Sequence, residues 1–281
     1  MKHKGLKIIS GVCIPICLIL LFSFNQNSFK EENSTKGSQI KLNVAAYNVE
    51  FSDKGTAEEI GELLKPFNFD VVCFSEAPGG NWTKKVGSVM GLNHVIVGKY
   101  PTAGHKDKYK TIASRTPLSG YEEVLMADTL HTVTRAITIV NDKEIALYSV
   151  HFPFGWRDQA HIDETTGKVT AFVDYLKERQ TKEVSILMGD FNFLLSTEDY
   201  RSPYYEMFVD IGMVASWRDL NIDVIPLGSM VKFEQGKHKA GGVIDHIMYP
   251  RNKVKAIDGN IIEMVQPLSD HKPVWALLQI K

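Results

Sequence analysis

Short apolar segments of strand length recur along most of the chain, separated by Gly, Pro, Asn and Asp residues. Residues 40–47 alternate apolar and polar side chains, which is typical of a strand with one buried face. The segments 70–74 and 184–188 are almost wholly apolar, so we expect strands that are buried on both faces. Further strands are predicted, in chain order, at 94–100, 109–114, 121–126, 131–140, 144–150, 243–249, 254–264 and 273–280.

Helices are indicated where apolar residues recur at a spacing of three or four. The first begins with Thr56 and Glu59, which have the spacing of a capping box. The longest is predicted at 162–179, where one face of the helix is apolar. Shorter helices are expected at 82–90 and 204–211. The strand–helix–strand order near the N-terminus places the ends of the first two strands at one edge of a sheet.

The first 24 residues differ from the rest of the chain. Three lysines precede an apolar run over residues 8–24, which is the pattern of an export signal. No small-x-small cleavage motif directly follows it, because Phe24, Asn25 and Gln26 intervene, so an uncleaved N-terminal membrane anchor is the alternative. Residues 25–39 are polar and predict a flexible linker. We therefore expect a signal peptide or anchor at 1–24, a linker at 25–39, and a folded domain at 40–281 that lies outside the cytoplasm, either secreted, periplasmic or membrane-anchored.

Composition indicates a globular domain and argues against bulk attraction to nucleic acid. Hydrophobic residues make up 44% of the chain and charged residues 23%, as in soluble globular proteins. Without the leader, 29 basic residues stand against 33 acidic ones, which is not the charge of a protein that binds a phosphate backbone indiscriminately. Outside the leader the only cysteine is Cys73, so no internal disulfide is expected.

Polar side chains able to bind a metal ion or a phosphate follow most of the predicted strands. The segment 184–188 runs through Gly189 into Asp190 and Asn192. Residues two apart on a strand share a face, so this carboxylate and amide project together. They suit the binding of a water molecule and a phosphate oxygen, whereas an Asx turn is the structural alternative. Other strand ends carry Asn48, Glu76, His151, Asp270 and His271. Gathered at one rim, such residues form a site.

Some polar residues of the predicted strands need a partner or have a structural alternative. Asp245 lies in an apolar strand, where an unpaired carboxylate is costly, and we expect His271 to be its partner. His246 points to the opposite face and is expected to be structural. Arg135 would support the site or form a cross-strand ion pair. His151, considered alone, suits a polar strand end.

Six short motifs follow one another between residues 41 and 281. They are Tyr47-Asn48-Val49, Phe74-Ser75-Glu76, Val150-His151, Gly189-Asp190-Phe191-Asn192, Ile244-Asp245-His246-Ile247 and Ser269-Asp270-His271-Lys272-Pro273-Val274. In content and order they resemble the endonuclease/exonuclease/phosphatase superfamily, which has the DNase I-like fold. The Gly-Asp-Phe-Asn motif followed by Ser-Asp-His-x-Pro-Val is the most specific part of this resemblance. Residues 112–118 also look like the family's mid-chain strand and turn.

The resemblance implies an α/β (α+β) fold, a four-layer sandwich of two packed mixed β-sheets flanked by helices. It also implies hydrolysis of a phosphate ester with a divalent metal, usually Mg²⁺, with Mn²⁺ or Ca²⁺ as alternatives. A cation is useful because a phosphodiester is anionic and repels hydroxide. Mg²⁺ keeps several waters, so one or two carboxylates suffice to hold it.

The resemblance further implies a role for each residue of the rim. Glu76 is the expected direct metal ligand, with Asn48 and Asp270 completing or supporting the metal site. Asp190 would orient and deprotonate the attacking water, while Asn192 holds a phosphate oxygen.

The two histidines of the rim would act on the phosphoryl group. His151 and His271 would donate hydrogen bonds to its oxygens or protonate the leaving group, and Asp245 would hold His271 in the right tautomer. Besides Asn192, Arg115 and Tyr109 are expected to contact the substrate.

Two loops bear on which phosphate ester is the substrate. Residues 99–110 are basic with two tyrosines, and 152–157 carry aromatic side chains after His151. Such residues suit a nucleic acid or a phospholipid headgroup, or the aromatics are buried instead. The leading hypothesis is a phosphodiesterase or endonuclease-like enzyme that acts as a monomer. The alternatives are a sphingomyelinase- or phosphoinositide-phosphatase-like enzyme and a non-catalytic binding module on the same fold.

Overall fold

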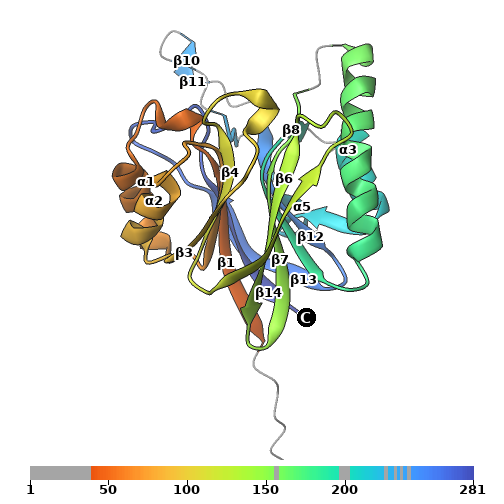
Figure 1. The fold of residues 1–281 in the computed structure, drawn as a ribbon, viewed down its shortest axis with the longest axis horizontal. Coiled ribbons are helices and arrows are strands. Elements are labelled where there is room, and N and C mark those ends of the chain that lie inside the picture. Colours follow the sequence, from red (N-terminus) through yellow and green to blue (C-terminus); the bar gives the residue numbers. More distant parts are fainter. Residues whose placement is uncertain are drawn as a thin grey trace, which may run out of the picture. The chain divides into compact units, whose positions relative to one another are not determined.

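Two six-stranded mixed sheets pack face to face at the centre of the fold, and helices cover their outer faces (Figure 1). This computed structural model describes residues 39–154, 158–195, 203–224, 227–230, 233–234, 237–238 and 242–281. The predicted leader and nearly all of the linker lie outside these residues. Among the helices of the described residues, none is long and apolar enough to cross a membrane. The predicted four-layer sandwich is confirmed.

The first sheet has the strand order β13–β14–β1–β2–β4–β3. Its strands are β1 (Ile40–Asn48), β2 (Val71–Ala77), β3 (His94–Val97), β4 (Tyr109–Ser114), β13 (Val254–Ile261) and β14 (Val274–Ile280). β1 and β2 run parallel, and the other neighbours in this sheet are antiparallel.

The second sheet has the order β5–β6–β7–β8–β12–β9. Its strands are β5 (Leu118–Leu125), β6 (Thr132–Val140), β7 (Lys143–His151), β8 (Val184–Leu195), β9 (Met213–Ala215) and β12 (Val243–Pro250). β7 and β8 run parallel, and the other pairs are antiparallel. Two short strands, β10 (Phe233–Glu234) and β11 (Lys237–His238), pair separately from both sheets.

The helices are α1 (Ala57–Leu64), α2 (Trp82–Met90), α3 (Gln159–Arg179), α4 (Pro203–Asp210) and α5 (Ser216–Asp219). Among the helices of the described residues, α1 and α3 begin at a side chain that caps them. The predicted capping box is present, since Thr56 and Glu59 each accept a hydrogen bond from the other's backbone N–H. α3 begins before the predicted residue 162, because the Asp158 side chain accepts a hydrogen bond from the backbone N–H of His161.

Both faces of β1 are buried, and each face belongs to a different core. Val44 and Ala46 share the core between the sheets with Leu147 of β7. Ala45 and Tyr47 belong to a second core that includes apolar residues of α1 and α2. Burying a Val or Leu side chain in this way contributes about 1.5–3 kcal/mol. The alternation of side chains along the strand therefore divides β1 between the two cores, with Val44 and Ala46 facing the other sheet.

The register of the strands brings polar residues to one edge of the two sheets. In the second sheet, Asp190 of β8 lies opposite His151 of β7 on one side and opposite Asp245 of β12 on the other. In the first sheet, Asn48 of β1 lies opposite Ser75 of β2. The parallel pairs end at the same edge, so their carboxyl ends deliver these side chains together.

Gly189 is the residue where a side chain would interfere most directly with this register. Its φ is +146°, and a Cβ would lie 2.1 Å from the carbonyl oxygen of Val150. We expect Gly189→Ala to lower the free energy of unfolding by roughly 2–4 kcal/mol, because β7 and β8 must separate to admit the methyl group. Urea denaturation measures this loss.

The matched control is Gly167→Ala, in the exposed part of α3. A Cβ at Gly167 would have no heavy atom within 4 Å, and alanine favours the helix by about 0.5–1 kcal/mol. This variant should be slightly more stable than the wild type. Equal stability of Gly189→Ala and the wild type would contradict the assigned role of Gly189.

Candidate active site

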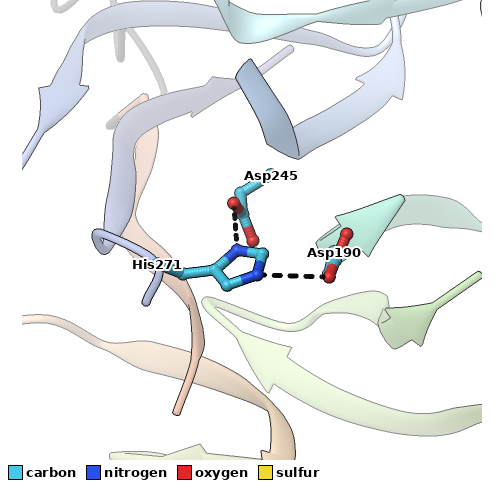
Figure 2. Close-up of side chains that lie close together, drawn as sticks. All are labelled: Asp190, Asp245 and His271. Atoms are coloured by element: carbon cyan, nitrogen blue, oxygen red, sulfur yellow. Dashed lines mark hydrogen bonds and ion pairs between the residues drawn. The ribbon is translucent and has the colours of Figure 1, made fainter. Parts of the chain in front are cut away.

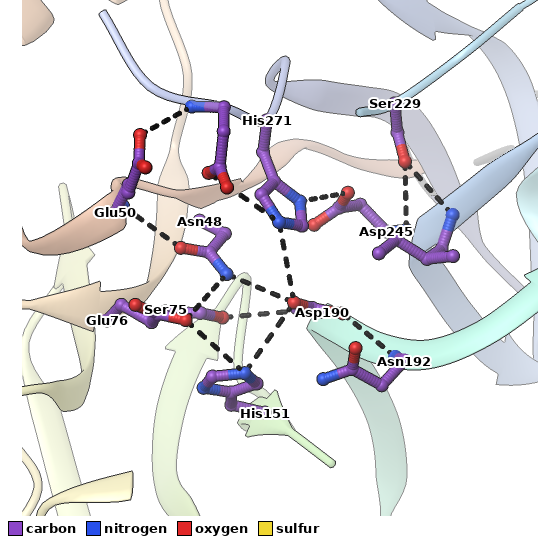
Figure 3. Close-up of polar contacts among 12 residues, drawn as sticks. Asn48, Glu50, Ser75, Glu76, His151, Asp190, Asn192, Ser229, Asp245 and His271 are labelled. Atoms are coloured by element: carbon purple, nitrogen blue, oxygen red, sulfur yellow. Dashed lines mark hydrogen bonds and ion pairs between the residues drawn. The ribbon is translucent and has the colours of Figure 1, made fainter. Parts of the chain in front are cut away.

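The polar rim predicted from the strand ends is present at one edge of the sandwich (Figure 3). Contacts of 4.0 Å or less connect Asn48, Glu76, His151, Asp190, Asp245, Asp270 and His271, and Asn192 is joined to them through its backbone. These residues come from both sheets and from the loop before β14. The structure therefore brings eight of the ten predicted site residues together.

Asp245, His271 and Asp190 form a line of alternating charge (Figure 2). His271 Nδ1 lies 2.8 Å from Asp245 Oδ2, and His271 Nε2 lies 3.7 Å from Asp190 Oδ2. Burial lowers the pKa of His271, but the charges of Asp245, Asp190 and Asp270 and the hydrogen bond to Asp245 raise it to about 10. His271 is therefore an imidazolium at neutral pH, with both ring nitrogens protonated.

The backbone around Asp245 is fixed by one serine. Asp245 is fully buried, and the Ser229 hydroxyl accepts hydrogen bonds from the backbone N–H groups of Ile244 and Asp245, at 3.0 and 3.2 Å. One oxygen of the carboxylate accepts from His271, while Oδ1 has no hydrogen-bond partner in the described part of the chain. The carboxylate therefore depends on His271 for its main compensation, as its burial predicts.

Asp190 collects hydrogen bonds on both carboxylate oxygens. Oδ2 accepts from Asn48 Nδ2 at 3.0 Å, and Oδ1 accepts from the backbone N–H of Asn192 at 2.8 Å. Burial raises the pKa of Asp190, while the positive charge of His271 opposes this rise. A raised pKa makes this carboxylate a better proton acceptor than an exposed aspartate. The Asn192 amide, in turn, donates to the carbonyl oxygen of Phe152 at 2.8 Å.

Glu76 projects from a strained position at the end of β2. Its φ is +52°, which is uncommon for a residue with a side chain. Its Oε1 lies 3.4 Å from Asn48 Nδ2 and 3.7 Å from His151 Nε2, while Oε2 pairs with Lys108 Nζ at 2.6 Å. Strain of this kind is found at functional sites, where surrounding contacts hold the backbone in place.

His151 is the neutral histidine of the site. Burial lowers its pKa to about 4, although the charge of Asp190 raises it. Its Nε2 lies 3.6 Å from Asp190 Oδ2 and 3.7 Å from Glu76 Oε1, while the buried Nδ1 has no partner among the described residues. Because only Nε2 faces acceptors, we assign the single proton of the ring to Nε2.

The charges of the site fit a divalent cation. Four carboxylates, those of Glu76, Asp190, Asp245 and Asp270, face two cations in the described part of the site, Lys108 and the His271 imidazolium. Two negative charges are thus left without a counter-charge, and oxygen ligands of this kind suit Mg²⁺.

Two sets of residues offer ligands for such an ion. Asp190, Asp245 and His271 place ligand atoms within 4.8 Å of one another. A protonated imidazole, however, has no lone pair for a metal. The predicted set of Glu76, Asn48 and Asp270 offers oxygens instead, and Glu76 lines the cavity described next.

A cavity of about 310 Å³ opens above these residues. Glu76, His151, Asp190, Asn192 and His271 line one part of it. The remaining lining residues are Thr102, Ala103, His105, Lys108, His131, Phe152, Phe154, Met230 and Ile244. The volume is at the lower end of the range for small-molecule sites, so the cavity suits a phosphate group with its immediate substituents.

Two predicted substrate contacts lie elsewhere. Arg115 follows β4 at the end remote from the site, where it donates to Asn68 Oδ1 at 2.8 Å and to the carbonyl oxygen of Phe69 at 2.7 Å. Tyr109 is at the near end of β4, but its ring lies against Gly79 and does not line the cavity. The structure therefore corrects the prediction for Arg115, while the substrate contact of Tyr109 stays a prediction, with Tyr109 outside the lining of the cavity.

Two other polar strand residues have structural partners. His246 is buried on the opposite face of β12, as predicted, where Trp217 Nε1 donates to its Nδ1 at 3.2 Å. Arg135 is buried and pairs with Glu183 at 2.6 Å, away from the rim. The residues 155–157 of the predicted aromatic loop lie outside the described residues, while Phe152 is buried and Phe154 lines the cavity.

The site also contains residues that the sequence did not single out. Lys108 pairs with Glu76, and Ser229 fixes the backbone of Asp245. Glu50 accepts from the backbone N–H of Asp270 at 2.9 Å, and Ser75 donates to the carbonyl oxygen of Val150 at 2.8 Å. Two of these residues had a signal in the sequence, since Lys108 belongs to the basic loop at 99–110 and Ser75 to the motif Phe74-Ser75-Glu76.

Asp245→Asn tests the electrostatic coupling of His271. The substitution removes the carboxylate that raises the pKa of His271, while the burial that lowers this pKa remains. We expect NMR titration to find the His271 imidazole deprotonating well below pH 10. His246 is the internal control, because burial lowers its pKa to about 3 and it should stay neutral in both proteins.

The contact between Asp245 and His271 also predicts how the free energy of unfolding depends on pH. The raised pKa of His271 contributes stability that is fully present below its unfolded value of 6.5 and is lost as pH rises through about 10. The unfolding free energy of the wild type should therefore fall over this interval, and less so in Asp245→Asn. An unchanged midpoint for His271 would contradict the coupling.

Comparison with known proteins agrees with the fold and with the order of the motifs. The model of the Endonuclease/Exonuclease/phosphatase family matches residues 45–271. An endonuclease/exonuclease/phosphatase from Beutenbergia cavernae superposes with a TM-score of 0.67 at 15% identity, covering 85% of this chain and 72% of the other. No curated protein sequence matches the chain.

Two similar structures contain DNA. TDP2 of D. rerio, complexed with a single-strand DNA product, has a TM-score of 0.65 at 14% identity and coverages of 85% and 98%. The 3′ phosphatase NExo from Neisseria, bound to a product DNA hairpin, has a TM-score of 0.62 at 19% identity and coverages of 84% and 98%. At such identities these likenesses concern the fold. The family match spans most of the chain and includes the residues of the site, and on this ground the chain belongs to the endonuclease/exonuclease/phosphatase family.

Proposed function

We propose that this protein is a divalent-metal-dependent hydrolase of phosphate esters, and foremost a phosphodiesterase. The observation that carries the proposal is the position of Asp190. Its carboxylate lies between the imidazolium of His271, at 3.7 Å, and the amide of Asn48, at 3.0 Å, on the wall of the cavity. A base and a cationic donor thus border the same space, which is the arrangement that hydrolysis of an anionic ester requires.

Asp190 would act as the general base. Its raised pKa favours accepting a proton from a water molecule in the cavity. The hydrogen bonds from Asn48 and from the backbone of Asn192 fix the direction in which the carboxylate points. The water would then be aligned with the phosphorus atom before the attack.

The two histidines would serve different purposes. His271 is charged at neutral pH and would donate from Nε2 to a phosphoryl oxygen as negative charge builds up there. His151 is neutral and would donate a hydrogen bond from Nε2 without adding charge. Asn192 lines the same cavity and would hold a further phosphoryl oxygen.

Glu76 would be the direct ligand of the metal ion, supported by Asn48 and Asp270. When bound, a divalent cation neutralises the charge of the ester and stabilises the leaving oxygen. Mg²⁺ is the expected ion, because the ligands are oxygens and few in number. Mn²⁺ and Ca²⁺ are the alternatives.

For the substrate, we place nucleic-acid-like diesters first and phospholipid headgroups second. The structures of NExo and TDP2, two proteins of similar fold, were determined with DNA products, which supports the first choice.

The basic n-region and apolar run at the N-terminus support action outside the cytoplasm, with the leader either cleaved or kept as a membrane anchor. Cell fractionation tests this location. Recovery of the protein in the cytosol would exclude action outside the cytoplasm.

A substrate panel tests the proposed activity. Residues 36–281 are assayed with Mg²⁺ on DNA, on phospholipid vesicles and on small phosphodiesters, with EDTA as the metal-free arm. We expect His271→Gln to lower kcat by roughly 10²–10⁴-fold, because the donor to the developing charge is lost. His94→Gln is the control, since His94 lies on the edge strand β3 outside the site. Activity that survives both EDTA and His271→Gln would refute the mechanism.

Glu76→Gln tests the metal site separately from turnover. Calorimetry with Mg²⁺ should find binding weakened by about 10–100-fold, because the carboxylate proposed as the direct ligand is lost. Glu263→Gln is the matched control, since Glu263 is exposed and pairs only with Lys272 in the described part of the chain. Equal Mg²⁺ affinity of Glu76→Gln and the wild type would remove Glu76 from the metal site.

A further inference from the structure

The cavity has a second part, to which the proposed chemistry assigns no contact with the hydrolysed phosphate. Thr102, His105 and Lys108 come from the β3–β4 loop, and His131 immediately precedes β6. No carboxylate lines this part among the described residues, whereas Glu76 and Asp190 line the catalytic part. The cavity is therefore acidic on one side and rich in hydrogen-bond donors on the other.

Lys110 does not line the cavity but is buried beneath the loop that carries Thr102 and Lys108. Its side chain shares a face of β4 with Ile112, which belongs to the core between the sheets. Its Nζ donates to the carbonyl oxygen of Tyr100 at 3.3 Å, beneath the turn that carries Thr102. No carboxylate lies within 4.0 Å of this ammonium in the described part of the chain. Lys110 is therefore a buried cation that uses one of its three donors.

Unused hydroxyl groups surround the same region. Thr102 is 3% exposed and lines the cavity, yet its Oγ1 has no hydrogen-bond partner among the described residues. Thr132, at the start of β6, is 1% exposed, and its Oγ1 also lacks a partner. Of the two residues, only Thr102 lines the cavity, so its hydroxyl is the one that can donate to an anion bound there. A buried polar group without a partner is costly, so a ligand that satisfies Thr102 would recover that cost.

Electrostatics connects Lys110 to both walls of the cavity. Burial lowers the pKa of Lys110 to about 8, and the charge of Glu123 opposes this shift, so the ammonium predominates at pH 7. Its positive charge also lowers the pKa of His131 and of His151, which both line the cavity. The field of this lysine therefore reaches the space where a ligand would sit.

We propose that the part of the cavity lined by Thr102 and Lys108, with the buried Lys110 beneath their loop, binds a second phosphate of the substrate, beside the one that is hydrolysed. This inference rests on the proposed function, because it adds a phosphate subsite to the same cavity. Thr102 would donate to the second phosphate directly, and so would Lys108 through the N–H groups that Glu76 does not accept. Lys110 would supply positive charge from behind the wall in a medium of low dielectric. Two sources offer this chemistry, the neighbouring phosphate of a polynucleotide and the extra phosphate of an inositol headgroup.

Two substrate families distinguish these sources. The first is a thymidine dinucleotide with one diester, compared with the same dinucleotide carrying a 5′- or a 3′-phosphate. The second is glycerophosphoinositol, compared with its 4-phosphate. For the wild type with Mg²⁺, we expect the extra phosphate to raise kcat/KM by about 10–100-fold in one family, the range of a charge-assisted hydrogen bond. In Lys110→Met and Thr102→Val, the ratio of kcat/KM with the extra phosphate to kcat/KM without it should fall toward one.

Two further readouts separate a binding role of Lys110 from a structural one. Calorimetry with thymidine 5′-monophosphate and thymidine 3′,5′-bisphosphate repeats the comparison without turnover. Thermal unfolding without ligand should find the Tm of Lys110→Met raised by about 2–4 °C, because an unpaired buried charge has been removed. Lys253→Met is the matched control: Lys253 donates to the carbonyl oxygens of Gln180 and Glu183, so its loss should lower the Tm and leave the ratio unchanged.

The proposed function and the phosphate subsite can fail separately. A wild type that hydrolyses neither member of any family refutes the proposed function, and calorimetry with the two nucleotides then tests by itself whether the subsite binds a second phosphate. A wild type that hydrolyses both members equally and binds both nucleotides equally overturns the subsite. So does a lower Tm of Lys110→Met combined with an unchanged ratio, since Lys110 would then be a structural partner of Glu123. A preference confined to one family identifies the source of the second phosphate.

Discussion

The hydrogen-bonded register of β8 between β7 and β12 is the constraint on which the site depends. It sets His151 and Asp245 on either side of Asp190. Backbone pairing alone therefore places three residues from distant parts of the chain side by side. A slip of one residue would turn Asp190 to the outer face. Gly189 maintains the register, because only a residue without a Cβ fits against the Val150 carbonyl. The backbone hydrogen bonds of these strands thus determine which side chains meet in the site, and the electrostatic contacts follow from that placement.

Two buried histidines of the same site end in opposite charge states, and the reason is geometric. Burial lowers the pKa of both, so it cannot distinguish them. His271 has a carboxylate at 2.8 Å, and its proton is held, whereas the carboxylates nearest to His151 stand at 3.6 and 3.7 Å. The positive charges of Lys110 and His271 also lower the pKa of His151, so neighbouring cations and carboxylates together leave one ring cationic and the other neutral. The phosphate would meet one of each.

The sequence was most informative where a buried polar group demanded a partner. The contact between Asp245 and His271 followed from the cost of burying a carboxylate, and it is present at 2.8 Å. Arg115 was misplaced because a motif does not reveal which end of its strand reaches the site. β4 runs antiparallel to β2, so the start of β4 lies near Glu76 and its end lies away. The pairing of Lys108 with Glu76 could not be predicted either. Lys108 lies in an irregular loop, where no hydrophobic periodicity indicates the direction of a side chain.

The way the site is shared among strands has a consequence for the synthesis of the protein. β14 lies between β13 and β1, so the first strand of the described chain completes its pairing only with the last one. His271 precedes this last strand, whereas Asn48 ends the first. Contacts between such distant segments form late, because the chain must close long loops first. A nascent chain would therefore carry an incomplete site until β14 has been synthesised and has paired with β1.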